Sequence, residues 1–204
     1  MLTIVDYGMG NLRSVQNAVT FLGKEARVSG DPAMVAGSSK LILPGVGSFR
    51  RAMENIRSRG LFDALSDAVL LRHVPVLGIC LGMQLFASYG HEDGGADGLG
   101  WIPGEVVPFR FKDSSIRVPH IGFNSVQAVS PSSQLFGYLS EPTDFYFVHS
   151  YHLQCVKSQD VAAWCDYHGR IVAGVEKDNV FGAQFHPEKS QANGLTVLSR
   201  FLRI

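Results

Sequence analysis

A cysteine between two glycines is the residue of this chain best placed to do chemistry. Cys80 lies in the segment Gly78–Gly82, between the apolar run Val74–Leu77 and a predicted helix over Met83–Tyr89. This spacing fits a nucleophile elbow, a strand-to-helix turn so tight that only hydrogen fits where a Cβ would lie. The sulfur would then lie at a helix N-terminus, where N–H groups and the helix dipole favour a thiolate. The pattern predicts a nucleophile; the alternative is an ordinary buried cysteine.

A histidine and a glutamate follow a second apolar segment near the C-terminus. His186 ends the run after Val180–Phe185, and Pro187 pushes it towards an extended backbone. Side chains two residues apart in an extended segment point to the same side, so we expect Glu188 beside His186. Together with Cys80 they would form the base, orienting carboxylate and nucleophile of a cysteine triad.

A glycine-containing loop supplies candidate donors for such a site. Gly45-Val46-Gly47 follows the apolar segment Lys40–Pro44 and exposes backbone N–H groups at the carboxyl edge of a sheet. With the N–H of Leu81, those of Val46 and Gly47 can form an oxyanion hole for a tetrahedral intermediate.

These segments resemble a known enzyme family. Pro44–Gly47, Gly78–Gln84 and Phe185–Ser190 are similar to the three signatures of class I (triad) glutamine amidotransferases. More narrowly, the chain resembles the glutaminase subunits of imidazole glycerol phosphate synthase in the segments Asp6–Val15, Pro119–Asn124 and Phe147–Tyr151. The likeness extends over essentially the whole chain and implies one amidotransferase domain, residues 1–204, that hydrolyses glutamine through a cysteine thioester.

The resemblance also implies substrate contacts and a partner. The candidate glutamine contacts are Gly47, Gln84, Glu92, Ser150 and Tyr151, with Glu92 suited to the α-ammonium group. Ammonia is mostly protonated in water near neutral pH, so it must reach its acceptor by a shielded path. The resemblance implies that the acceptor site lies on a (β/α)₈-barrel cyclase subunit, in a heterodimer that serves histidine biosynthesis. The candidate docking residues are Asn11, Arg13, His120, Phe123, Asn124, Tyr146 and Lys189.

The two glycines of the oxyanion loop predict that one of its backbone N–H groups can turn away from the site. Because Gly45 and Gly47 tolerate either sign of φ, a peptide flip between them is sterically cheap. We therefore expect the free chain to be a poor glutaminase until its partner and the partner's ligand bind.

Other functions fit parts of the sequence. The family often has Trp where this chain has Phe123, which also fits paralogous subunits that feed ammonia to enzymes modifying surface-polysaccharide sugars. A non-catalytic flavodoxin-like binding module would not need the three triad residues together, and a stand-alone cysteine hydrolase would need no partner. A metal site at His149 and His152 is disfavoured, because residues three apart on a strand point to opposite faces.

Composition argues against nucleic-acid-binding, membrane and secreted proteins. The 204 residues are 46% hydrophobic with a formal net charge of zero, which gives no electrostatic case for nucleic acid or an anionic membrane. We see no run of about 18 apolar residues and no charged-then-apolar leader pattern, so we expect a protein that neither spans a membrane nor is secreted. The three cysteines lack a disulfide framework, so a cytoplasmic protein is expected. Neither a P-loop nor a full dinucleotide fingerprint is present, and we expect no cofactor and no metal.

The elements alternate in the first half and become strand-rich in the second. This rhythm predicts a single-domain α/β, flavodoxin-like fold with a mostly parallel central sheet and helices on both faces. We expect strands at Leu2–Tyr7, Lys40–Leu43, Val74–Ile79, Val106–Phe111, Phe123–Val129, Phe145–Tyr151, Val161–Tyr167, Ile171–Glu176 and Val180–Phe185. We expect helices at Asn11–Leu22, Phe49–Ser58, Leu61–Leu71 and Asn193–Leu202, a surface loop at His91–Gly100 and a hairpin turn at His168–Arg170.

Overall fold

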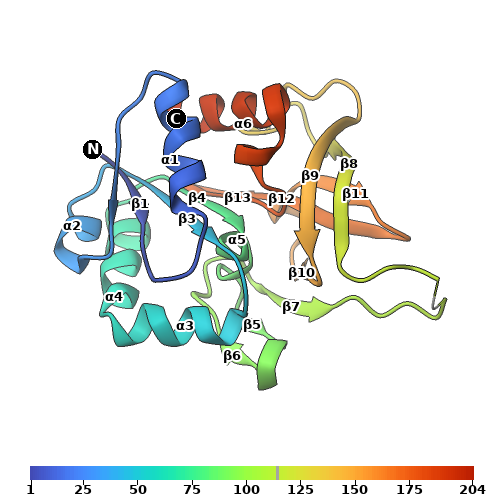
Figure 1. The fold of residues 1–204 in the computed structure, drawn as a ribbon, viewed down its shortest axis with the longest axis horizontal. Helices are drawn as coiled ribbons and strands as arrows, with labels where there is room; N and C mark the ends of the chain where they lie inside the picture. The colour runs from blue at the N-terminus through green and yellow to red at the C-terminus, as the bar shows by residue number, and fades with distance from the viewer. Residues whose placement is uncertain (114) are drawn as a thin grey trace.

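One large sheet organises the molecule. The computed structural model describes residues 1–113 and 115–204 (Figure 1). Its main strands are β1 Leu2–Val5, β2 Ala26–Ser29, β3 Lys40–Gly45, β4 Val76–Cys80, β8 His120–Ala128, β9 Thr143–His149, β11 Val161–Asp166, β12 Arg170–Lys177 and β13 Val180–Ala183. Over the described residues they form nine strands in the order β2-β1-β3-β4-β13-β12-β11-β8-β9. The pairings from β2 to β13 are parallel and those from β13 to β9 are antiparallel.

Helices cover both faces of the parallel part. In Figure 1, α1 (Leu12–Phe21) and α6 (Gln191–Arg203) lie above the sheet, and α3 (Phe49–Ser58) and α4 (Leu61–Ser66) lie below it. Successive side chains of a strand point to opposite faces, so Leu41 and Leu43 pack with α3 and α4 while Ile42 packs with α1 and α6. Burial on both faces explains the continuous apolar runs of these strands. The predicted α/β fold with helices on both faces is confirmed.

A smaller sheet contributes Tyr151 to the lining of the cavity described below. It consists of β5 (Tyr89–Gly90), β6 (Ala96–Asp97), β7 (Gly104–Pro108) and β10 (Tyr151–Cys155), in the order β10-β7-β5-β6. The predicted loop His91–Gly100 therefore contains β6, as well as a 3₁₀ turn at Glu92–Gly94. The predicted strand at Val106–Phe111 belongs to this sheet as β7 and ends at Pro108.

The predicted helix Met83–Tyr89 is wrong. The helix α5 spans only Leu81–Gln84. Beyond it, the carbonyl groups of Leu85 and Phe86 accept hydrogen bonds from the backbone N–H groups of Leu99 and Ile102. A helix needs those carbonyls for its own N–H groups four residues on, so the incoming loop ends α5 after about one turn.

Other boundaries differ in smaller ways. The strand β2 and the helix α2 (Pro32–Ala36) were not predicted, and α6 begins two residues before the predicted Asn193. The hairpin at residues 168–170 is confirmed: the Tyr167 N–H donates to the Gly169 carbonyl at 2.9 Å, between β11 and β12. Among the described residues, every helix is too short or too polar to cross a membrane.

Candidate active site

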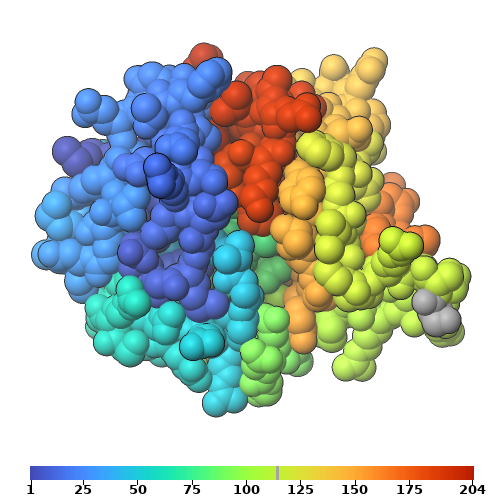
Figure 2. All heavy atoms as spheres, viewed as in Figure 1, coloured from blue at the N-terminus to red at the C-terminus, as the bar shows by residue number. Residues whose placement is uncertain are grey.

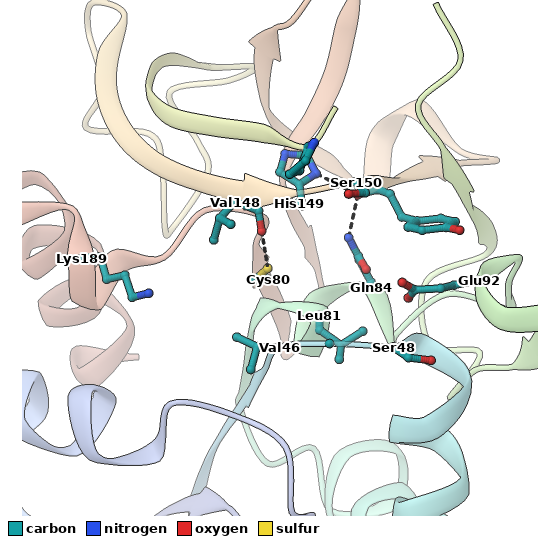
Figure 3. A pocket seen from close by; sticks show the side chains of 13 residues that line it. Val46, Ser48, Cys80, Leu81, Gln84, Glu92, Val148, His149, Ser150 and Lys189 are labelled. Carbon is teal, nitrogen blue, oxygen red and sulfur yellow. Dashed lines mark hydrogen bonds between the residues drawn. The ribbon is translucent and has the colours of Figure 1, made fainter. Parts of the chain in front are cut away.

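A cavity of about 500 Å³ opens at the carboxyl ends of β3 and β4, beside the turn from β9 to β10. The carboxyl edge of a parallel sheet is the usual ligand-binding place in this type of fold. Figure 3 shows Cys80 at the tip of its turn facing into this space, with Gln84 and Glu92 on one side and Lys189 on the other. The cavity is lined by Val46, Gly47, Ser48, Cys80, Leu81, Gln84, Glu92, Pro119, Val148, His149, Ser150, Tyr151 and Lys189.

The turn that carries Cys80 is a strained elbow. Cys80 is the last residue of β4 and has φ 54° and ψ −111°, a conformation that costs a non-glycine residue about 1–3 kcal/mol. A Cβ on Gly78 would lie 2.6 Å from the Met83 nitrogen, and one on Gly82 would overlap the Leu43 carbonyl oxygen. Both glycines are therefore required, which agrees with the elbow predicted from the sequence.

His186 and Glu188 form a buried pair. His186 Nδ1 lies 2.8 Å from Glu188 Oε1, and the two side chains are 2% and 1% exposed. The extended backbone predicted for this segment is wrong beyond His186: Pro187–Lys189 is a 3₁₀ turn, which brings Glu188 back under the ring. The Ser190 hydroxyl donates to the His186 carbonyl at 2.6 Å and fixes that turn.

The second ring nitrogen of His186, Nε2, is the atom that can accept a proton from a nucleophile. Within residues 1–113 and 115–204, His186 Nε2 is buried and has no hydrogen-bond partner. Burial lowers the pKa of His186, but the hydrogen bond to Glu188 and the negative charges of Glu188 and of a Cys80 thiolate outweigh it and raise the pKa to about 10. Both groups stabilise the imidazolium. In this conformation the Cys80 thiol points elsewhere, donating to the Val148 carbonyl with 3.9 Å between Sγ and O.

The predicted glutamine contacts line the same cavity. Glu92 Oε2 accepts a hydrogen bond of 2.8 Å from the backbone N–H of Phe49, at the start of α3. Burial raises the pKa of Glu92, the Phe49 N–H opposes that rise, and the neighbouring Asp93 adds to it. Gln84 donates from Nε2 to the Tyr151 carbonyl at 2.8 Å, and Figure 3 draws a dashed line from the Gln84 amide. Gly47 and Ser150 are also lining residues.

The three candidate oxyanion donors also border the cavity. Leu81 is buried at the start of α5, whereas Val46 is exposed and Gly47 has φ 97°. The donor residue at the elbow, Leu81, is thus held by packing. The donor residues of the loop are less constrained: Val46 is exposed to solvent, and Gly47 has a backbone conformation that other residues rarely adopt.

The candidate docking residues separate into two groups. Phe123 is 51% exposed, its ring meets that of Tyr146 at 5.6 Å between centroids, and Lys189 Nζ lies 5.8 Å from the Tyr146 ring. His120, in contrast, is 2% exposed. Its Nδ1 lies 3.0 Å from His149 Nε2 and its Nε2 lies 3.2 Å from Asn124 Nδ2. His120 therefore supports β8 and β9 from inside and does not present its ring to a partner.

Sequence reasoning missed several side chains at this site. Gln184 is fully buried and donates from Nε2 to Cys80 Sγ at 3.7 Å; its place two residues before His186 was the available signal. Exposed Ile121, beside Phe123 on β8, was also missed. No group of three or more His, Cys, Asp or Glu side chains that could hold a metal ion occurs in the described part of the chain.

Known proteins share this sequence and fold. Residues 3–204 match the family "Glutamine amidotransferase class-I". The chain is 43% identical over 204 residues to imidazole glycerol phosphate synthase subunit HisH 1 of Campylobacter jejuni, with all of both chains covered. It is 41% identical over 203 residues to subunit HisH of Leptospira interrogans, with 98% of each covered.

Solved structures agree on the fold. A crystal structure of a glutamine amidotransferase superposes with a TM-score of 0.77 at 20% identity, covering 98% of this chain and 97% of that one. PurLQS from Thermotoga maritima gives a TM-score of 0.68 at 20% identity, covering 99% and 97%. Family match, full-length identity and fold lead to one conclusion: the chain belongs to the class I glutamine amidotransferases, and within them to the family of the HisH subunits.

Proposed function

We propose that this chain is the glutaminase subunit of an imidazole glycerol phosphate synthase and supplies ammonia for histidine biosynthesis. The observation that carries the proposal is the buried His186–Glu188 pair, 2.8 Å apart, beside a cysteine on a strained elbow at the cavity. The names of full-length relatives at 41–43% identity support the choice of pathway.

The site residues suggest how the reaction proceeds. The thiol proton of Cys80 passes to His186 Nε2, and the sulfur attacks the side-chain amide carbon of glutamine. Backbone N–H groups of Leu81 and of the loop at Val46 and Gly47 stabilise the oxyanion. When the intermediate collapses, His186 returns the proton to the leaving nitrogen and ammonia departs. A γ-glutamyl thioester remains on Cys80.

Water completes the cycle. His186 removes a proton from a water molecule that attacks the thioester carbon, and the proton then goes to the departing sulfur. Glutamate is released and the thiol is restored. Glu188 holds the imidazole in the tautomer that leaves Nε2 free and stabilises its protonated form.

The substrate is positioned by charged and polar groups of the same cavity. The Glu92 carboxylate would accept the α-ammonium group of glutamine, while Gln84, Gly47, Ser150 and Tyr151 border the rest of the molecule. A cavity of about 500 Å³ has room for a ligand of this size.

The partner in this proposal is a (β/α)₈-barrel cyclase subunit, in a cytoplasmic heterodimer through which ammonia is channelled. Figure 2 shows one face of the molecule on which α1, α6, β9 and β8 lie side by side. Exposed Phe123 of β8 contacts Tyr146 of β9, and Lys189 lies over the Tyr146 ring, so the three side chains form an aromatic and cationic cluster. Such side chains are common in protein interfaces. Asn11, Arg13 and Asn124 complete the proposed docking face.

Glutamate release from glutamine tests the proposal. We expect slow release by the free chain, and strong stimulation by the barrel subunit with its nucleotide ligand, because the oxyanion loop needs the partner. Cys80→Ala should abolish release, and Cys165→Ala, which removes a buried thiol of β11, should not. Release that survives Cys80→Ala would refute the proposed nucleophile. Full activity of the free chain would refute the expected control of the oxyanion loop by the partner.

Phe123 favours a second candidate for the enzyme that accepts the ammonia. Phe123 cannot donate the hydrogen bond of an indole N–H, and a paralogous subunit serving a sugar-modifying synthase would not need it. If the barrel cyclase fails to stimulate this chain although Cys80 is essential, the acceptor is that of the paralogue.

A further inference from the structure

Gln184 contacts the sulfur of Cys80 from within the protein. It follows β13 directly, is fully buried, and places Nε2 3.7 Å from Cys80 Sγ. A buried glutamine needs partners for its amide, and here one of them is the reacting atom. This contact is separate from the cavity that would hold glutamine, because Gln184 is not among the cavity-lining residues.

The orientation of the Gln184 amide is fixed by its neighbour. The Nε2 group of Gln84 can only donate, and it donates to the Tyr151 carbonyl at 2.8 Å and to Gln184 Oε1 at 2.9 Å. A carbonyl oxygen can only accept, so Tyr151 sets the direction of the Gln84 amide. Gln84 in turn sets that of Gln184. The oxygen of Gln184 is thus turned to Gln84, and its N–H groups are turned to the sulfur.

The Tyr151 carbonyl is itself held in place. His149 Nδ1 lies 2.8 Å from the same oxygen, and the neutral His149 ring receives a hydrogen bond at Nε2 from His120. The Tyr151 carbonyl therefore accepts from both His149 and Gln84, and from Gln84 onward each hydrogen bond is donated towards the sulfur. All of these groups are buried or half-buried.

We propose that Gln184 is a catalytic residue that stabilises the Cys80 thiolate by donating an amide hydrogen bond, with Gln84 as the residue that positions it. The proposal rests on the proposed role of Cys80. When the thiol proton moves to His186 Nε2, negative charge develops on Sγ, and a donor already aimed at Sγ favours that charged form. An amide does not titrate, so its donor remains present at every pH. The Val148 carbonyl, which accepts from the thiol at 3.9 Å, can offer nothing to the anion.

The test is the pH dependence of Cys80 alkylation in the full chain by iodoacetamide, with the modified cysteine identified by peptide mass spectrometry. Gln184→Met keeps the length of the side chain and removes the donor. We expect its alkylation midpoint to move up by about one pH unit, with about ten-fold slower alkylation below the midpoint. Gln184→Glu places an acceptor at the sulfur and should shift the midpoint further.

A matched control separates this role from a loss of packing. Ser38→Ala removes a buried hydrogen bond to Thr3 at the far end of β3 and should lower stability without moving the midpoint. The proposal is overturned if Gln184→Met leaves the midpoint at its wild-type value, or if Ser38→Ala moves it equally. Because alkylation needs no glutamine, that result would leave the proposed function intact; glutamate release by Cys80→Ala is the separate result that would refute Cys80 as the nucleophile.

Discussion

Two buried histidines near Cys80 have opposite acid–base properties. His186 and His149 lie close enough for the charge of one to affect the other. The pKa of His186 is raised to about 10, and that of His149 is lowered to about 3. Burial lowers both. The difference comes from the groups around them: the Glu188 carboxylate and the charge of a Cys80 thiolate for His186, and a backbone carbonyl and a second neutral imidazole for His149.

This comparison shows how one site obtains a base and a support from the same residue type. His186 can accept a proton because Glu188 stabilises the product of that transfer. His149 stays neutral, so it keeps a fixed tautomer and can serve as a hydrogen-bonded support for the Tyr151 carbonyl. Chemical role thus follows from the groups that face each ring, and burial alone would have made both rings alike.

The largest expected effect comes from making His186 resemble His149. Glu188→Gln keeps the shape of the side chain and removes its charge. We expect glutamate release to fall by about 10³–10⁴-fold, as when the carboxylate of a triad is replaced by its amide. Steady-state assays with the partner present measure the change. Glu54→Gln, which breaks an exposed ion pair with Arg50, is the control and should stay near wild type. An equal loss in both variants would contradict the role of Glu188.

A smaller effect is expected at the carboxylate on the opposite side of the cavity. Glu92→Gln should raise KM for glutamine by about ten-fold, the range of a hydrogen bond to a charged group, with a smaller change in kcat. The pKa of Glu92 lies above its usual value, mainly because of burial. KM of the wild type should therefore rise as the pH falls through that raised pKa, and Glu92→Gln should remove this rise. The exposed neighbour variant Asp93→Asn should keep it.

The third prediction concerns stability. His149 is neutral in the folded protein down to about pH 3, while an unfolded histidine takes up a proton below its ordinary value of 6.5. Between those limits the unfolded state binds the extra proton, so stability falls as the pH falls. The contribution of one such group is at most about 1.4 kcal/mol per pH unit. His149→Asn should flatten the slope of the unfolding free energy between pH 6.5 and 4, measured by urea denaturation. The exposed His73→Asn should leave it unchanged, and equal slopes in all three proteins would refute the assignment.

The parts of the site that depend on local spacing were predictable. Two glycines around Cys80 fix the elbow because backbone atoms occupy the space of a Cβ on either side. The sequence neighbours His186 and Glu188 were expected to meet, although a 3₁₀ turn achieves this in place of an extended segment. The α/β fold followed from apolar runs that alternate with helical segments.

The parts that depend on distant contacts were not predictable. The helix α5 ends after Gln84 because of hydrogen bonds from the loop at Leu99–Ile102, which is outside the local sequence window of the helix. The burial of His120 comes from its place between Phe147 and Tyr167, and the orientation of Gln184 from Gln84, 100 residues away. Local patterns carry no information on such pairings, because each depends on which strands become neighbours in the sheet.

The central claim is that Cys80 attacks glutamine with His186 as its base, and trapping the covalent intermediate tests it most directly. The chain with its partner would be mixed with glutamine, quenched in acid within one turnover, and its peptides analysed by mass spectrometry. We predict a γ-glutamyl group on Cys80 that is absent from Cys155 and Cys165, and that does not form in Cys80→Ala. Glutamate release with no adduct on Cys80, or release that persists in Cys80→Ala, would contradict the account.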